Sequence, residues 1–377
     1  MMARRRQQKR RIEGCVASMS SEIITDNSLL AQTLSIAGKN ERLRNTIFEG
    51  LRQAEMESDD AATFREEVRW PLVMSLLSEV KTHRVTLENG LIFEVSPDSR
   101  IEKALLLSTV EHPDHVWEPQ TTRLLMALTK EAAHVIVGGA YIGDQVLPIA
   151  KAMAGVNPSG TVHAFEPMQH PFVRLLRNLE INQITNVMAH CVGLWDRSNV
   201  SLSVEGHLAL ASSIPVDEAQ NTSPEVIQSI SIDDYVRSRQ LQSVNLIMLD
   251  TEGGEQKALI GARETITRDA PNLVFEIHRH FVDWTEGLEK TSIVEFLTSQ
   301  DYEVFAIRDF HNNYSMAEHP IEIIPVAHVH LDGPPHGFNL LATKQSDLLE
   351  RLDLRIVENV SPKLLLHKDP ALHHPIY

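Results

Sequence analysis

The chain has 377 residues, 42% of them hydrophobic and 23% charged, which is the composition of a globular protein with a sizeable core. Its formal net charge of −16 argues against a general nucleic-acid binder and against docking on an anionic membrane, because both need concentrated Lys and Arg. Cys15 and Cys191 are too few for a disulfide framework, and no apolar segment is long enough to span a membrane, so we expect a cytoplasmic protein.

Residues 1–115 are expected to form an N-terminal extension of helices and a hairpin. The basic start "ARRRQQKRR" predicts a disordered, solvated tail, with a targeting address or an interaction arm as the alternatives. Helical stretches are expected at residues 28–38 and 40–55. The stretch "RVTLENGLIFEV", residues 84–95, predicts a β-hairpin because alternating apolar positions flank Asn89 and Gly90.

An amphipathic helix is expected at residues 118–131, and strands and helices alternate after it. Strands are expected at 134–139, 160–167, 186–194, 244–250, 271–278, 302–309 and 336–344. Helices are expected at 142–154, 170–182, 231–239, 255–266 and 290–300. This alternation predicts an α/β domain over residues 116–345, with a mostly parallel sheet, helices on both faces, and a C-terminal tail at 346–377. Ligands bind such sheets outside the carboxyl ends of the strands.

The first of these strands ends in a glycine-rich loop. Gly138 and Gly139 lack the Cβ that would hold a ligand away from the backbone, and the next helix offers free N–H groups. The spacing of Gly138, Ala140 and Gly143 resembles the dinucleotide fingerprint, so NAD is one candidate cofactor. About twenty residues later Glu166 can accept hydrogen bonds from both hydroxyls of a ribose, unless it is only a surface charge near a helix start. NAD and S-adenosylmethionine both carry a ribose, so Glu166 does not separate them.

Acidic side chains follow the next two strands of the sheet. Asp250, Glu252 and Glu255 place three carboxylates within six residues at a strand end. A dehydrogenase has no standard use for them, whereas a transferase that handles a cation and a hydroxyl does; Glu255 could equally serve the dipole of the helix that it begins. Glu276 and His278 share one face of the following strand, where His278 is either a hydrogen-bonded structural residue or a proton acceptor.

These residues resemble the FkbM-type family of S-adenosylmethionine-dependent methyltransferases. The resemblance covers about residues 115–343 and is carried by "VGGAYIG", "FEP", "CVGLWD", "SISIDDYV", "VNLIMLDTEGGEQKALIGA", "NLVFEIH" and "FNLLATK". It implies a seven-stranded class I methyltransferase sheet, preceded by the helical and hairpin extension, which would partly cap the pocket. It also implies S-adenosylmethionine as the cofactor.

The resemblance assigns roles to individual residues. The expected cofactor contacts are Gly139, Ala140, Gly143, Asp144, Glu166, Pro167, Cys191, Val192 and Asp250. In this assignment the loop holds the methionine end, Glu166 the ribose, and the stretch around Cys191 lies beneath the adenine. Asp250, Glu252 and His278 are the expected catalytic residues, with Asp250 positioning an acceptor hydroxyl and His278 taking its proton. No residue is assigned as a metal ligand.

The sequence departs from the family pattern at three positions. Members usually carry aspartate at Val137, asparagine at Tyr141 and lysine at Met248. Val137 removes an acceptor for the cofactor's ammonium group, for which Asp144 offers a substitute. A non-catalytic binding module with a degenerate cofactor loop is therefore the alternative to an active enzyme.

The resemblance implies O-methylation of a small molecule, a sugar or a secondary metabolite that carries a hydroxyl. Metal-assisted transfer is a further hypothesis, because His278 and His280, and likewise His328 and His330, are spaced to share one strand face. The oligomeric state stays open.

Overall fold

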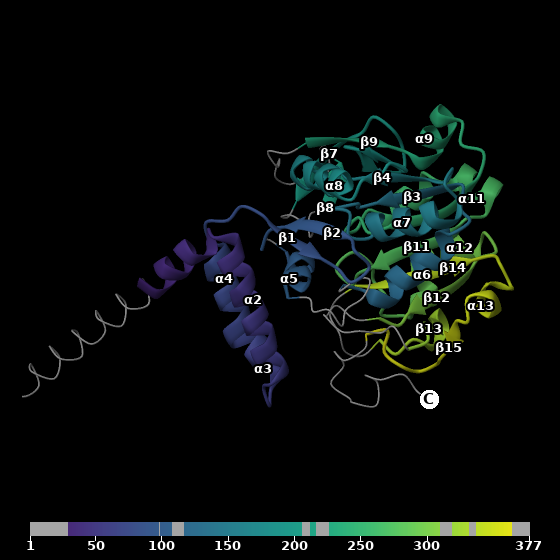
Figure 1. Ribbon diagram of the computed structural model, residues 1–377. Helices are drawn as coiled ribbons and strands as arrows, with labels where there is room; N and C mark the ends of the chain where they lie inside the picture. Colours follow the sequence, from purple (N-terminus) through teal and green to yellow (C-terminus); the bar gives the residue numbers. More distant parts are fainter. Residues whose placement is uncertain are drawn as a thin grey trace, which may run out of the picture. The chain divides into compact units, whose positions relative to one another are not determined.

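The computed structural model (Figure 1) describes residues 29–97, 99–107, 117–205, 212–215, 226–309, 319–331 and 337–363. They form two compact units: one contains the residues up to 84 together with 95–97, and the other contains 85–94 and the residues after 97. The basic start and residues 364–377 lie outside the described residues. The domain boundaries expected after residues 115 and 345 stay predictions.

The first unit is helical. A helix over residues 29–38 is followed by α2 (Glu41–Met56), α3 (Ala61–Phe64), the π-helix η1 (Arg65–Arg69) and α4 (Trp70–Leu77). Glu55 is buried and forms ion pairs with Arg65 and Arg69, which tie α2 to η1. The two helices expected in this region are confirmed.

The predicted hairpin is also present. Its strands are β1 (His83–Thr86) and β2 (Ile92–Val95), and Gly90 between them has a φ of 79°, a conformation that favours glycine. Helix α5 (Arg100–Leu106) follows. The backbone N–H groups of Ile92 and Glu94 donate to the side chains of Asn182 and Asn178, so β2 is fastened to the end of helix α8 (Gln169–Ile181).

The second unit is built on a sheet of nine strands, in the order β15-β13-β12-β14-β11-β10-β3-β4-β5. The strands are β3 (His134–Gly138), β4 (Thr161–Phe165), β5 (Val187–His190), β10 (Val244–Leu249), β11 (Asn272–Ile277), β12 (Glu303–Ile307), β13 (Glu322–Pro325), β14 (Phe338–Thr343) and β15 (Arg355–Ile356). The expected count of seven is corrected, because β13 and β15 extend the sheet beyond β12.

The strand directions identify the ligand-binding edge. Strands β5, β4, β3, β10 and β11 are parallel and follow the doubly wound order 3-2-1-4-5, whereas β14 is antiparallel to both of its neighbours. The order reverses between β3 and β10. The α/β prediction is thus confirmed, with a mixed sheet, and the carboxyl ends of β3 and β10 mark the switch point.

Helices cover both faces of this sheet. Helices α6 (Pro119–Thr129) and α7 (Val146–Val156) contact each other and pack on β10 and β4. On the opposite face lie α9 (Ile232–Arg239), α10 (Glu255–Ile260), α11 (Arg263–Asp269) and α12 (Ser292–Thr298). Ile136 belongs to the apolar cluster on this second face, while the equally buried Val135 and Val137 alternate with it and point to the first.

Two expected elements are interrupted. The strand expected at 186–194 divides into β5 and β6 (Gly193–Leu194), and β6 joins a second sheet with β9 (Val226–Ile230), β7 (Ser201–Glu205) and β8 (Ser212–Pro215). The helix expected at 255–266 divides into α10 and α11 at Gly261, where a Cβ would lie 2.1 Å from the Trp195 carbonyl oxygen.

Strand β13, next to the edge strand β15, offers a test of the nine-stranded sheet. Arg308 is fully buried, and its Nη1 lies 2.8 Å from Oε2 of Glu322 on β13. We expect Arg308→Met to lower the free energy of unfolding by about 3–5 kcal/mol, because the buried Glu322 carboxylate then keeps only its longer contact with Arg355. Arg308→Met combined with Glu322→Leu should recover most of that loss. Urea denaturation measures both.

A surface pair supplies the control for this measurement. Arg237 and Glu264 form an exposed ion pair, so Arg237→Met should change the free energy of unfolding by less than about 1 kcal/mol. A double variant as unstable as Arg308→Met alone would contradict the structural role of the buried pair.

Candidate functional site

A cavity opens at the switch point of the sheet. Its walls come from the loops after β3, β4 and β10, from β6, and from Ile101 of α5. Five of the nine expected cofactor contacts line it: Gly139, Asp144, Glu166, Pro167 and Asp250. Of the expected catalytic residues, Asp250 and Glu252 line it and His278 does not. The structure therefore brings the glycine loop, the ribose candidate and the acidic loop to one place.

The floor of the cavity depends on a close approach between two backbones. Gly139 has a φ of 76°, and a Cβ on it would lie 1.6 Å from the Asp250 carbonyl oxygen. The N–H groups of Gly139 and Ala140 both donate to the carbonyl oxygen of Phe165, at 3.0 Å each. Only glycine fits at position 139, because any side chain would push β3 away from β10. Ala140 and Gly143 shape this loop without lining the cavity.

Glu166 is held in one orientation by backbone donors. Its Oε2 accepts a hydrogen bond from the Tyr141 N–H at 2.8 Å, and its Oε1 accepts one from the Met168 N–H at 2.9 Å. Each carboxylate oxygen can accept more than one hydrogen bond. The protein therefore fixes the position of the Glu166 carboxylate and leaves its oxygens able to accept hydrogen bonds from two ligand hydroxyls.

Tyr141 has a different role from the asparagine of the family pattern. Its backbone has a φ of 44°, and its hydroxyl donates to Oε1 of Glu102 on α5 at 2.8 Å. Glu102 is fully buried and is also ion-paired with Arg174 of α8. Burial and the Glu102 carboxylate raise the pKa of Tyr141, so the phenol stays neutral and braces the loop against α5.

The turn into α7 carries two buried polar side chains. Asp144 is 6% exposed, and burial raises its pKa to about 7. Gln145 is equally buried and accepts a hydrogen bond from the Thr122 hydroxyl at 2.9 Å. Its Nε2 has no hydrogen-bond partner among the described residues. Since both residues line the cavity, they offer a ligand one carboxyl group and one unused donor.

Two departures from the family pattern are neighbours in the sheet. Val137 on β3 and Met248 on β10 are partners in the register of the parallel pair, and both are buried. Neither residue lines the cavity. Two apolar residues thus occupy the positions at which the family pattern has an acid and a base. Replacing a buried acid–base pair by apolar residues preserves the packing of the sheet.

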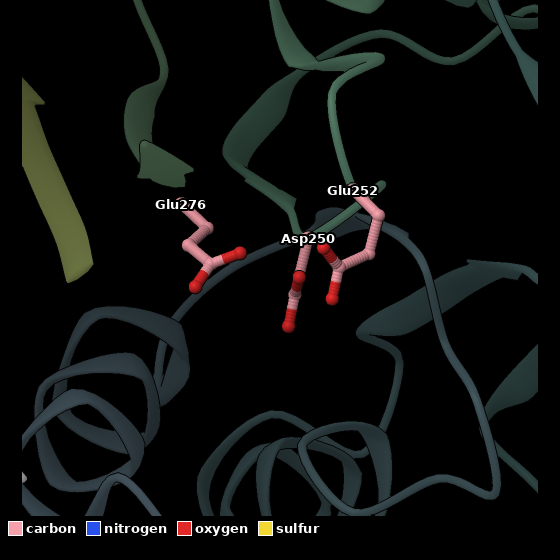
Figure 2. A group of neighbouring side chains, drawn as sticks. All are labelled: Asp250, Glu252 and Glu276. Carbon is pink, nitrogen blue, oxygen red and sulfur yellow. The ribbon is translucent and has the colours of Figure 1, made fainter. Parts of the chain in front are cut away.

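A group of three half-buried carboxylates lies on β11, at the end of β10 and in the loop after it. Asp250, Glu252 and Glu276 each offer an oxygen, and these oxygens all lie within 4.8 Å of one another (Figure 2). Burial and the Glu276 carboxylate raise the pKa of Asp250 well above its ordinary value. Burial and Glu255 raise the pKa of Glu252 to about 7, and burial also raises the pKa of Glu276.

Two further charges at this group were missed by sequence reasoning. Glu118, buried at the start of α6, raises the pKa values of Asp250 and Glu276. Lys363, 1% exposed, lowers the pKa of Glu276, while burial lowers its own. Glu118 was placed only as the first residue of a helix and Lys363 only in a tail, and no local pattern links either one to Asp250.

Glu255 and His278 are occupied by local hydrogen bonds. The Glu255 carboxylate accepts from the backbone N–H groups of Thr251 and Gly253, so it fixes the shape of the acidic loop. The Nδ1 of His278 accepts a hydrogen bond from the His280 N–H at 3.1 Å. In the neutral ring this leaves a protonated Nε2, which can donate but cannot take a proton.

The histidine pairs do not share strand faces as expected. His278 and His280 follow the end of β11 with their rings stacked at 4.7 Å. His328 lies in the 3₁₀ helix η4 (Val326–His328), where it contacts Glu358. The expectation fails because the strand ends before one pair and the backbone turns at the other.

The stretch expected beneath the adenine only partly borders the cavity. Cys191 is exposed, with its Sγ 3.6 Å from the Pro167 carbonyl oxygen, and neither Cys191 nor Val192 lines the cavity. The next residues, Gly193, Leu194 and Trp195, do line it. The adenine contact itself stays a prediction.

Asp144 makes a pH-dependent prediction. In the folded chain the pKa of Asp144 is about 7, above its ordinary value of 3.8. Between pH 3.8 and pH 7 the carboxyl group therefore loses its proton in the unfolded chain but keeps it in the folded chain. Wild-type stability should fall over this window, by at most roughly 4 kcal/mol, whereas Asp144→Asn has no such loss. The gain in melting temperature of Asp144→Asn over wild type should therefore be larger at pH 8 than at pH 5.

The exposed Asp283 provides the control, since a hydrogen bond from the Thr285 N–H lowers its pKa. Asp283→Asn should change the melting temperature equally at pH 5 and pH 8. An Asp144→Asn gain that does not depend on pH would contradict the buried, protonated Asp144.

Comparisons with known proteins agree with the resemblance. Residues 138–304 match the Methyltransferase FkbM domain. Among solved structures, the methyltransferase FkbM of Methylobacillus flagellatus KT is 17% identical, with a TM-score of 0.36, and the match covers 80% of this chain and 59% of that one. The O-methyltransferase TomG of Streptomyces achromogenes, which takes part in tomaymycin synthesis and was solved with S-adenosylmethionine, is 11% identical over 67% of this chain and 92% of its own, with a TM-score of 0.36.

A precorrin-6y C5,15-methyltransferase of Geobacter metallireducens is 14% identical over 60% of this chain and 89% of its own, with a TM-score of 0.34. Comparison with curated protein sequences gives no match. In the described part of the chain, every helix is too short or too polar to cross a membrane. Over residues 138–304 the chain is therefore similar to the FkbM methyltransferases.

Proposed function

We propose that the chain is an S-adenosylmethionine-dependent O-methyltransferase that acts on a hydroxyl of a sugar or a secondary metabolite. The observation that carries this proposal is the cavity at the switch point. It has a fixed, ribose-type carboxylate, Glu166, on one wall and the carboxylates of Asp250 and Glu252 on another. The FkbM domain match supports methyl transfer as the chemistry.

The residues of the cavity fit the cofactor's groups one by one. Gln145 Nε2 is an unused donor for a carboxylate, and Asp144 is an acceptor for an ammonium group, whose charge would draw the Asp144 pKa down again. Glu166 receives the ribose hydroxyls, and Leu194 and Trp195 offer an apolar wall. The cofactor, when bound, supplies a methyl group that is already activated by its sulfonium.

The protein's contribution to the transfer is alignment and removal of one proton. Asp250 and Glu252 line the cavity, so an acceptor hydroxyl that is hydrogen-bonded to them lies next to the cofactor site. The close contact between Gly139 and Asp250 keeps the two sites adjacent and so aligns the hydroxyl with the methyl group. The hydroxyl proton leaves toward the Glu252 carboxylate, whose pKa of about 7 suits a proton acceptor. His278 is outside the cavity lining, and its Nδ1 is occupied.

A non-catalytic binding module is the second candidate, favoured by the apolar Val137 and Met248 pair. Calorimetric titration with S-adenosylmethionine and, separately, with NAD tests both candidates and the cofactor choice. Binding of S-adenosylmethionine alone supports the site, and NAD binding alone contradicts it. Methyl transfer to any hydroxyl in an acceptor panel excludes the non-catalytic module.

The Glu166 carboxylate yields a prediction for donor affinity. Glu166→Gln replaces one acceptor oxygen by an NH₂ group that faces a backbone donor, either Tyr141 or Met168. Losing this charge-assisted contact should cost on the order of 2–3 kcal/mol of cofactor binding, measured by calorimetry. The exposed Glu180→Gln on α8 is the matched control and should bind as wild type does. Unchanged affinity in Glu166→Gln would exclude the ribose role.

Asp250 and His278 yield a prediction for turnover. Asp250→Asn should slow transfer by about 10²–10⁴-fold with donor affinity nearly intact, because it removes the carboxylate that faces the acceptor. His278→Ala should slow it less than about tenfold. Transfer of a labelled methyl group, with calorimetry for donor binding, measures both. A large rate loss in His278→Ala with intact donor binding would restore the histidine as the proton acceptor.

A further inference from the structure

The carboxylates of Asp250, Glu252 and Glu276 are held in an arrangement that their mutual repulsion opposes. They come from the end of β10, the loop after it, and β11, and Figure 2 shows them converging on one region. Their oxygens lie within 4.8 Å of one another. Like charges so close and partly withdrawn from water repel strongly, and the buried Lys363, which lowers the pKa of Glu276, supplies one positive charge against three carboxylates. The backbone adds to this, since Glu252 has a φ of 52°, an unusual conformation for a residue other than glycine.

The neighbouring strand β14 carries a further acceptor oxygen next to Glu276 in the sheet register. Asn339 on β14 is directly opposite Glu276 in the register with β11, so the two side chains leave the sheet side by side on one face. Asn339 is 3% exposed, and its Nδ2 donates to the Thr121 hydroxyl at 3.4 Å. Its Oδ1 has no hydrogen-bond partner among the described residues. Buried amide oxygens are normally paired, so this one points to a missing donor or cation.

We propose that Asp250, Glu252 and Glu276 bind a divalent cation, Mg²⁺ or Mn²⁺, and that Asn339 holds a water molecule bound to that ion. An all-oxygen set suits hard cations, whereas zinc sites are usually built from cysteine and histidine. Three protein ligands leave room for several water molecules, as Mg²⁺ prefers, while Ca²⁺ takes six to eight ligands. The amide oxygen then accepts from a coordinated water, a neighbour that commonly tunes metal affinity.

The cation would lie at the wall of the cavity, because Asp250 and Glu252 line it. An oxygen of the methyl acceptor could then be a further ligand of the cation, and this role rests on the proposed function. Binding of the cation itself does not rest on it. A titration that contains neither methyl donor nor acceptor therefore separates the two proposals, since a failure of methyl transfer leaves the metal result standing.

The test uses the full chain, freed of metal by a chelator and titrated with MnCl₂ while electron paramagnetic resonance follows free Mn²⁺. We expect one ion per chain, displaced by MgCl₂, and at least a tenfold rise of the dissociation constant in Asp250→Asn and in Glu276→Gln. Glu180→Gln removes an exposed carboxylate on α8, outside the cavity and the cluster, and should change the constant less than about twofold. An absence of Mn²⁺ binding, or equal losses in all three variants, would overturn the proposal.

Asn339 provides a second, independent arm. Asn339→Leu should weaken Mn²⁺ binding by about tenfold, and Asn339→Asp should tighten it, because a fourth carboxylate joins the set. If the amide instead donates to Glu276, Asn339→Asp would weaken binding and overturn the role given to its oxygen. Thermal unfolding with and without Mn²⁺ confirms that each variant is folded, since an ion bound to the folded chain raises the melting temperature.

Discussion

The contact between Gly139 and the Asp250 carbonyl oxygen is the constraint on which the rest of the site depends. It sets how closely the ends of β3 and β10 approach, since a Cβ at position 139 would lie 1.6 Å from that oxygen. The Asp250 N–H donates to Gly138, and the Gly139 N–H donates to Phe165, so three strand ends are locked together. The cofactor loop and the acidic loop both start from this junction. Their separation is therefore a property of the sheet and does not depend on flexible loops.

Buried carboxylates in this chain fall into two classes with different physics. One class is compensated by specific partners: Glu166 by backbone N–H groups, Glu102 by Arg174, and Glu322 by Arg308. These residues keep loops and strands in place. The other class comprises Asp144, Asp250, Glu252 and Glu276, whose pKa values are raised chiefly by burial. A buried charge without full compensation lowers the stability of the folded chain. Folds tolerate this cost mainly at functional sites, where a bound ligand provides the missing compensation.

Local pattern predicted the alternating elements, the glycine loop and the placement of Glu166, Asp250 and Glu252, because each depends on residues close in sequence. It could not show that Glu118 and Lys363 reach the acidic group, since they join it only through the fold. The break at Gly261 also depends on a residue that is far away in the sequence, because a Cβ at position 261 would meet the carbonyl oxygen of Trp195. Strands β13 and β15 have four and two residues, too few for a periodic signal. The occupied Nδ1 of His278 depends on a backbone turn that strand alternation cannot anticipate.

The contacts of Tyr141 and the position of β14 limit where the chain can be cut to make a shorter fragment. The segment matched to the family, residues 138–304, contains Tyr141 and Arg174 but lacks their shared partner Glu102. It also ends before β14, the strand that lies between β11 and β12 in the middle of the sheet. A fragment cut to the matched segment would carry a gap in its central sheet and an arginine without its carboxylate. The matched segment is thus narrower than the sheet and the ion pair that hold this part of the chain together.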